Sequence, residues 1–379
     1  MTRAYLLVLL FGCDGAHRDH LPDADVDATS DAAVVVTPSN ASDYGALESN
    51  GLVVAPSIDG TFDSETDCHA DSSLGNCTVA YRVQMPETCV CRAESITIDH
   101  YLRIRGGRAL VLYAAKDVTI GGVLDMSGGV GVQGPGASAY YPRKEDYWGG
   151  VGGSYGGRGG AGGSNTAQAS APVWGEPTLQ PLLGGMAGEG AGGTFAGGGG
   201  GALQITAGNS ITITGQINAG GGGCAGGPGG AMTTSGGGGG GSGGGVLLEA
   251  PKVAISGAVV ANGGGGGGGG GNDGKGMEGS AAAAQGVAIA ASGGNNYVQL
   301  CPGISYLSGG VGGYGMTGTT PAQDGGHDTW AGGCTGGARW IAGGGGGGGV
   351  GRIRINRLVP CDCEGTILPA ATFGTLKTD

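Results

Sequence analysis

One short segment recurs four times along this 379-residue chain, and this repetition limits the folds available to the chain more than any other feature. The unit Ala109–Gly129 aligns without a gap with Ala202–Gly222, which lies 93 residues further on. Val246–Gly264 aligns after the loss of one residue, and Arg352–Ala370 aligns with the second unit at an offset of 150. Units that cannot bury their apolar residues alone are stabilised by stacking on their neighbours. The sequence therefore predicts a solenoid.

Each unit holds three short runs in which apolar and polar residues alternate, the pattern of half-buried β-strands. In the second unit this alternation places Ile211, Ile213 and Ile217 on the inside and the intervening threonines on the outside. A matching run upstream lies 22 residues earlier, which is the length of one coil of three strands. We therefore predict an all-β protein, with a right-handed parallel β-helix over residues 93–370.

Glycine supplies 95 of the 379 residues and is concentrated in blocks that follow the third run of a unit. Insertions at one phase of a solenoid emerge on one side of it, so we expect glycine-rich insertions on one face of the β-helix. Residues 149–163 have a near-triplet rhythm of paired glycines. That rhythm suits close-packed polyproline-II-like segments held partly by Cα–H···O contacts, and a flexible linker is the alternative.

The first thirteen residues have the layout of an export signal, with a positive charge at Arg3, an apolar run over residues 4–11, and then Gly12-Cys13. The end of this segment resembles a bacterial lipobox. The resemblance implies a signal peptide over residues 1–12 and lipid attachment at Cys13, and the alternative is an ordinary signal peptide with an incidental cysteine. We expect a lipoprotein held outside the cytoplasm on the bacterial cell envelope, at the outer membrane or cell surface rather than the inner membrane.

Charge is distributed unevenly along the chain. Residues 13–99 carry 16 acidic and 3 basic side chains, whereas residues 100–379 carry 14 of each. Residues 13–43 have no aromatic residue and are rich in Asp, Ala, Ser and Thr, which predicts a disordered acidic tether. A body without an excess of basic residues is a poor partner for nucleic acid. Gly-X-Gly-X-X-Gly matches arise by chance at this glycine content, so we expect no cofactor.

Nine cysteines follow Cys13, and the expected state of cysteine in an exported chain is the disulfide. Residues 44–92 precede the first repeat and are predicted to form an N-terminal cap, and residues 371–379 form a C-terminal tail. Each Cys-X-Cys pair has one intervening residue, too few for a zinc knuckle, so no metal site is expected. The disulfide candidates, whose pairing the sequence leaves open, are Cys68, Cys77, Cys89, Cys91, Cys361 and Cys363.

Three motifs occur together within residues 93–370: Ile211-Thr-Ile-Thr-Gly-Gln-Ile-Asn-Ala-Gly, the preceding Gly-Gly-Gly-Ala-Leu, and a long loop with Gly-Gly-Arg-Gly-Gly and Trp174-Gly-Glu-Pro. In this combination the chain resembles a family of glycine-rich bacterial surface lipoproteins that are predicted to form right-handed parallel β-helices. The resemblance implies that architecture and no activity, because none is established for the family.

Aromatic residues are concentrated in one glycine-rich insertion. Tyr147, Trp148, Tyr155 and Trp174 are the candidate ligand contacts, since such rings stack on sugars and anchor protein interfaces. The alternative is that they form the small core that lets a glycine-rich loop fold.

Two classes of function remain. The first is a non-enzymatic, membrane-anchored structural or adhesion protein, with a glycan, matrix or cell-surface component as its expected partner. The second is a carbohydrate-active β-helix enzyme, a polysaccharide lyase or hydrolase, which needs carboxylates on neighbouring coils. Asp125 aligns with Asn218 and then with Val260, so this column offers one carboxylate and is predicted to be a structural ladder. No catalytic residue is assigned, and the first class is preferred.

Overall fold

The computed structural model describes residues 35–44, 51–56, 59–81, 87–138, 141–144, 148–164, 168–229, 235–271, 275–282, 291–295, 298–301, 304–308, 310–327 and 342–378. The predicted all-β class is confirmed in this part of the chain, where the one helical element is the 3-10 helix η1 (Ala41–Asp43). No helix within these ranges is long and apolar enough to cross a membrane. The predicted signal peptide, Cys13 and the tether as far as residue 34 lie outside the described residues.

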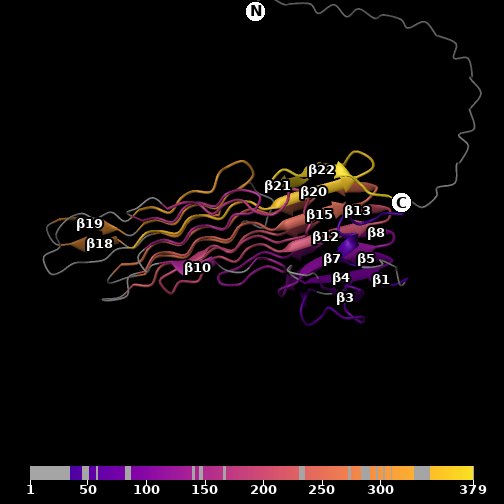
Figure 1. The fold of residues 1–379 in the computed structure, drawn as a ribbon, viewed down its shortest axis with the longest axis horizontal. Coiled ribbons are helices and arrows are strands. Elements are labelled where there is room, and N and C mark those ends of the chain that lie inside the picture. Colours follow the sequence, from indigo (N-terminus) through magenta and orange to yellow (C-terminus); the bar gives the residue numbers. More distant parts are fainter. Residues whose placement is uncertain are drawn as a thin grey trace, which may run out of the picture. The chain divides into compact units, whose positions relative to one another are not determined.

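Three large sheets, in which nearly every pair of neighbouring strands is parallel, make up the strand-rich body (Figure 1). The five-stranded sheet has the order β1 (Val53–Val54), β5 (Ser95–Ile98), β8 (Asp117–Ile120), β13 (Ser210–Ile213), β16 (Lys252–Ile255). The six-stranded sheet has the order β2 (Gly60–Asp63), β6 (Tyr101–Arg105), β9 (Val123–Asp125), β14 (Gln216–Asn218), β17 (Ala258–Val260), β21 (Thr366–Leu368). The seven-stranded sheet has the order β22 (Thr372–Thr375), β20 (Arg352–Arg357), β15 (Gly245–Glu249), β12 (Ala202–Ala207), β7 (Ala109–Ala114), β4 (Thr88–Ala93), β3 (Asn76–Ala80), and its β3–β4 pair is antiparallel. Two small sheets join β10 (Tyr141–Lys144) to β11 (Glu189–Ala191), and β18 (Val298–Cys301) to β19 (Ile304–Ser308).

The register of these sheets agrees with the alignment of the repeats. Leu203 pairs with Leu110, at the offset of 93, and is in line through β15 with Ile353, at the offset of 150. Ile96 pairs with Val118, at the spacing of 22 residues. Strands from equivalent positions of successive repeats therefore lie side by side in the same sheet, as the repeats predict.

The apolar core lies between the three sheets, and the alternation within each strand explains why. In β13 the buried residues Ile211 and Ile213 alternate with the half-buried Ser210 and Thr212. Ile211 has Val118 on one side and Val253 on the other in register, so each apolar residue packs on its equivalents in neighbouring repeats. Full burial of such a side chain contributes about 1.5–3 kcal/mol.

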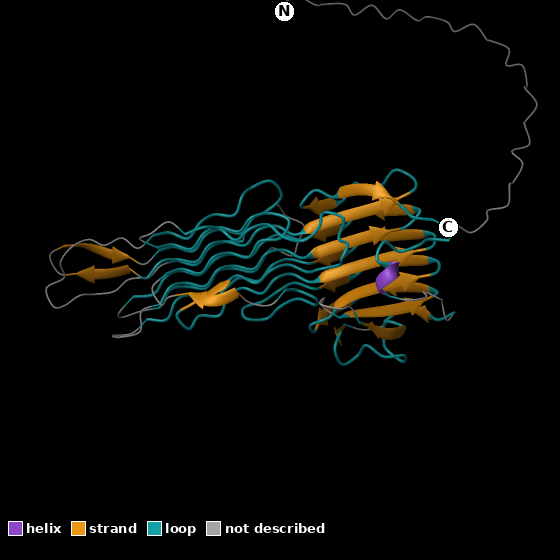
Figure 2. Ribbon diagram, viewed as in Figure 1, coloured by secondary structure: helices purple, strands orange, loops and turns teal. Residues whose placement is uncertain are grey.

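The glycine-rich insertions leave this body at one phase of the repeat. They follow β9, β14 and β17 in the six-stranded sheet, and each returns to the next strand of the seven-stranded sheet. Figure 2 shows these loops running side by side away from the same side of the strands. The expected common exit of the insertions is therefore observed.

Backbone hydrogen bonds with a period of three residues hold the insertions together. In residues 235–245, every third amide donates to the same neighbouring segment. One set of amides donates to the segment 343–349: Gly237 to Gly343, Gly240 to Gly346 and Gly243 to Gly349. A second set donates to the segment 219–225: Gly238 to Ala225, Gly241 to Gly222 and Gly244 to Ala219. A third set donates to the segment 186–189: Gly239 to Glu189 and Ser242 to Met186. Three residues per turn is the period of polyproline II, so the amides of one segment donate to three different segments around it.

Close packing explains why these positions are glycine. Residues 235–245, 261–271 and 342–350 are buried throughout. A Cβ built on Gly345 would overlap the carbonyl of Gly238, and one on Gly241 would overlap that of Gly198. The described insertions are thus packed segments, as the first of the two alternatives predicted, and we call them the glycine bundle.

Residues 35–44, which we call the N-terminal strap, pack against the body, although composition placed residues up to 43 in a disordered tether. Thr37 donates its amide to the Lys377 carbonyl (3.0 Å), and Val36 forms an antiparallel bridge with Thr378. The Glu249 carboxylate, fully buried on β15, accepts a hydrogen bond from the Ser39 amide (3.0 Å).

Donors on two neighbouring strands complete the environment of this carboxylate. Gln204 Nε2 donates to Glu249 at 2.7 Å and Asn356 Nδ2 donates at 2.9 Å. Polar side chains of the seven-stranded sheet thus hold the N-terminal strap in place, although the composition of the strap alone predicts disorder.

Candidate functional site

Tyr155, one of the predicted ligand contacts, is completely buried. Its hydroxyl donates to the Leu183 carbonyl (2.8 Å), its ring lies 5.8 Å from that of Trp174 between centroids, and the Arg352 guanidinium lies 5.4 Å from the ring centre. Burial also raises the pKa of its hydroxyl well above the usual value. Tyr155 packs with Leu179, Leu183 and Leu247 as a small core, so its position favours the structural alternative.

The other predicted contacts differ in where they lie relative to Tyr155. Trp174 is half-buried and packs against the same small core. Trp148 is also half-buried, and no ring contact within the described residues joins it to that pair. Tyr147 lies outside the described residues.

A groove of about 500 Å³ lies elsewhere on the glycine bundle, and we call it the Phe195 groove. Its lining comes from two parts of one insertion: Gly131, Gln133, Ala187, Gly193, Thr194, Phe195, Ala196 and Gly198. Phe195 is 68% exposed, although an aromatic side chain is usually largely buried. Sequence reasoning did not single out this ring as a ligand contact. The available signal was one phenylalanine separated from a run of five glycines by Ala196.

Local turn chemistry builds the first wall of the groove. Val130 pairs with Gly197 and Gly129 pairs with Val132 in antiparallel bridges, which close a tight turn around Gly131. Gly131 adopts φ +66°, a left-handed conformation that a residue with a side chain rarely takes. A Cβ at this position would also come within 3.1 Å of the Phe195 ring.

The opposite wall is a turn held by side-chain hydrogen bonds. The Ala191 amide donates to the Thr194 hydroxyl (2.9 Å), and this hydroxyl in turn donates to the Ala191 carbonyl. Ser235 Oγ donates to the carbonyl of Gly192 (2.7 Å), where φ is +45°. These bonds fix the turn that forms this wall of the groove.

None of the described residues that line the groove has an ionisable side chain. Its polar groups are the Gln133 amide, the Thr194 hydroxyl and the backbone. Turned to donate, the Gln133 amide nitrogen lies 3.1 Å from the Ala137 carbonyl and 3.2 Å from that of Ser138. The chemistry offered here is recognition of an uncharged ligand with one apolar face.

The predicted Asp125 column is a hydrogen-bonded ladder. Asn218 pairs with Asp125 in register and donates to its carboxylate (3.0 Å), and the Tyr101 hydroxyl donates at 2.8 Å. Arg103 forms an ion pair with the same carboxylate. Burial by itself raises the pKa of Asp125, but the Arg103 charge and hydrogen bonds from Ser127 and Tyr101 outweigh it and hold the pKa below its usual value. The carboxylate is fully partnered, which fits a structural role.

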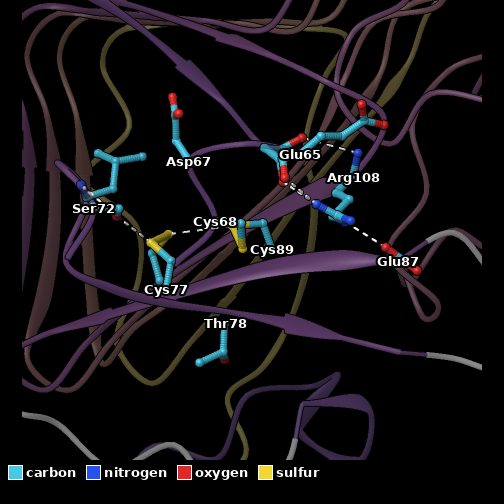
Figure 3. The surroundings of a disulfide bond; sticks show 12 residues. Glu65, Asp67, Cys68, Ser72, Cys77, Thr78, Glu87, Cys89 and Arg108 are labelled. Atoms are coloured by element: carbon cyan, nitrogen blue, oxygen red, sulfur yellow. Dashed lines mark hydrogen bonds and ion pairs between the residues drawn. A yellow bond between two sulfur atoms is a disulfide. The ribbon is translucent and has the colours of Figure 1, made fainter. Parts of the chain in front are cut away.

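The four cysteines of residues 44–92 form two neighbouring disulfides at strands β3 and β4 (Figure 3). Cys68 pairs with Cys89 and Cys77 with Cys91, with Cα–Cα distances of 5.8 and 3.9 Å. The sulfurs of Cys77, Cys89 and Cys91 lie within 4.8 Å of one another. A metal would need them as thiolates, and the disulfides remove those ligands.

The C-terminal pair, Cys361 and Cys363, also forms a disulfide. The backbone bridge between Asp362 and Ala254 places the two cysteines in line with the inward positions of β16, as the repeat alignment predicts. Cys224 is a free thiol, completely buried in the glycine bundle.

No family model matches this chain, and no match to it was found among curated proteins or solved structures.

Proposed function

We propose that this protein is a structural or adhesion component of the bacterial cell envelope, anchored outside the cytoplasm by a lipid on Cys13. In this proposal the three sheets are the faces of a right-handed parallel β-helix. The helix serves as a rigid support, and the glycine bundle is the surface that contacts a glycan, the matrix or another cell.

The order and register of the sheets support the β-helix. Strands β12, β13 and β14 follow one another along the chain and belong to three different sheets, and β15, β16 and β17 repeat that sequence one unit later. Parallel strands joined in this way cross over with a right-handed sense in almost all proteins.

The location proposed here rests on the export signal and on the disulfides. Disulfides persist in oxidising compartments outside the cytoplasm, and three are formed by the described cysteines. The segment between Cys13 and the N-terminal strap, residues 14–34, spans about 70 Å when fully extended, which is enough to hold the folded body away from a membrane.

The observation that carries the adhesion proposal is the glycine bundle itself. A large ordered layer of the chain contributes little to the apolar core, yet its close packing requires glycine at many positions. Such a layer is costly to order, because glycine loses more conformational freedom on folding than any other residue. A surface function explains its presence better than a contribution to the stability of the body.

Lipid labelling in cells tests the anchor. The full chain is expressed in a bacterial host with a clickable palmitate analogue, beside Cys13→Ser and, as a matched control, Cys224→Ser. We expect label on the wild-type chain and on Cys224→Ser, and none on Cys13→Ser. An unlabelled wild-type chain in the soluble fraction would refute the anchor.

Adhesion is tested with the same cells. Cells that display the wild-type chain should adhere to immobilised glycans or matrix above the level of cells that lack it. Adhesion no greater than in cells without the chain would refute the function, whereas shortening of a soluble polysaccharide would identify an enzyme.

A further inference from the structure

We propose that the Phe195 groove is a binding site for a neutral saccharide. The inference rests on the proposed function and assigns its contact surface to one described site. Three properties of the groove point to this ligand class: an exposed ring, an uncharged lining and unpaired backbone donors.

The exposed ring supplies the apolar contact. Phe195 is 68% exposed and sits at a groove whose size is within the range of small-ligand sites. The Gly131 backbone lies against the ring because it has no Cβ, which supports the ring from that side. The C–H face of a pyranose is flat and apolar, so it can cover the exposed part of the ring and remove it from water.

The lining restricts the ligand to uncharged molecules. A charged group placed in the groove would lose part of its hydration without a partner of opposite charge in the lining. Residues 100–379, which contain the groove, carry 14 acidic and 14 basic side chains, so they offer a polyanion no excess of positive charge. Uronates, sulfated glycans and phosphates are therefore disfavoured, and neutral hexoses are the saccharides that fit.

Unpaired backbone donors supply the polar contacts. Gly193 and Phe195 are both exposed, and their amides donate no hydrogen bond to any described residue. Sugar hydroxyls accept hydrogen bonds as well as donate them, so a hexose seated on Phe195 can accept from both amides. An apolar peptide side chain would cover the ring and leave these donors unpaired.

Binding to defined oligosaccharides tests the site. The full chain, purified in detergent, is titrated by calorimetry with neutral α- and β-linked hexose pentasaccharides and with oligogalacturonate. We compare the wild type with Phe195→Ala, with Phe195→Trp, and with Phe373→Ala as a matched control, because Phe373 is another exposed phenylalanine, on β22 (50% exposed). Circular dichroism and the melting temperature check that each variant is folded.

We expect at least one neutral pentasaccharide to bind, with affinity reduced tenfold or more in Phe195→Ala. Phe195→Trp should retain binding, and Phe373→Ala should leave it unchanged. Equal binding by folded Phe195→Ala and wild type overturns the proposal, as does binding of oligogalacturonate alone or of no saccharide. Cells displaying Phe195→Ala separate the two proposals: adhesion at the wild-type level would overturn the groove assignment while the adhesion function stands.

Discussion

A single methyl group placed in the glycine bundle is the most direct test of its packing. A Cβ on Gly237 would lie 2.0 Å from the carbonyl oxygen of Gly267 and 2.8 Å from that of Gly268. In protein structures a Cβ essentially never comes within 3.0 Å of a non-bonded heavy atom, so the two segments must separate by about 1 Å or more. Gly237→Ala therefore forces a change in the backbone, which a flexible side chain cannot absorb.

The cost follows from the contacts that this separation breaks. Three hydrogen bonds join the two segments, from the amides of Gly264, Gly267 and Gly270 to the carbonyls of Gly241, Gly238 and Ser235, at 2.8, 2.9 and 3.1 Å. Each contributes about 0.5–1.5 kcal/mol, and overpacking costs a further 1–3 kcal/mol. Restricting the unfolded chain returns about 0.4–1 kcal/mol. We expect a net loss of about 3–5 kcal/mol.

Calorimetry and hydrogen exchange measure this loss. For a folded unit of about 340 residues, the entropy of unfolding is such that a loss of 1 kcal/mol in stability lowers the melting temperature by roughly 1.4 °C. The melting temperature of Gly237→Ala should therefore fall by about 4–7 °C. The matched control is Gly129→Ala, whose Cβ would meet one atom within 4 Å, the Val132 Cβ at 3.8 Å. We expect the control to melt within about 1 °C of the wild type.

Exchange should also accelerate at the amides of residues 235–245 in Gly237→Ala. If Gly237→Ala melts and exchanges like the wild type, the bundle is not close-packed and the reasoning fails.

Three further variants or treatments probe the buried groups. Asp125→Asn removes a carboxylate whose pKa is held low beside Arg103. The stability that comes from this low pKa is present above the ordinary carboxyl pKa and is lost as the pH falls through the pKa of the folded state, so the variant should be less stable than the wild type by about 1–3 kcal/mol near neutral pH. In urea titrations the variant should lose less stability than the wild type below about pH 4, and parallel pH profiles of the two proteins would contradict this. Glu249→Leu leaves the buried donors around Ser39 unpaired, so it should lower the free energy of unfolding by about 3–5 kcal/mol and expose the N-terminal strap to protease. Glu249→Gln should have a smaller effect. An uncut strap in the leucine variant would contradict this role of Glu249. Burial raises the pKa of the Cys224 thiol to about 12, so peptide mapping at pH 8 should find Cys224 alkylated only after the protein is unfolded. Alkylation of Cys224 in the native protein would contradict this, because it would show that the thiol is accessible.

The strand-rich body could be predicted because its pattern of apolar and polar residues repeats along the sequence. The offset that pairs Leu203 with Leu110 was visible as a gapless alignment, and each repeat has the same alternation of inward and outward residues. The phase of the insertions followed from the same alignment. The three-residue period of the bundle was readable only as a rhythm over residues 149–163, because it is a property of segments that lie far apart in sequence.

The N-terminal strap could not be predicted from its own residues. Its composition is that of a disordered tether, and its order depends on partners such as Glu249, which lies 210 residues after Ser39. The environments of the aromatic residues could not be predicted for a similar reason. A glycine-rich loop carries few side chains, so composition cannot distinguish a ring that faces solvent, such as Phe195, from one that fills the loop's small core, such as Tyr155.

The three-residue period of the bundle bears on how this protein can change over generations. Every single-base change in a glycine codon that is not synonymous either introduces a residue with a Cβ or stops translation, so amino-acid substitution in residues 235–245 has few tolerated outcomes. Loss or gain of one residue would rotate the remainder of a segment by about a third of a turn and direct its amides to the wrong neighbours. Loss or gain of three residues restores every pairing. Natural variants should therefore differ in the length of these segments by multiples of three residues, and the reach of the contact surface should vary in the same steps.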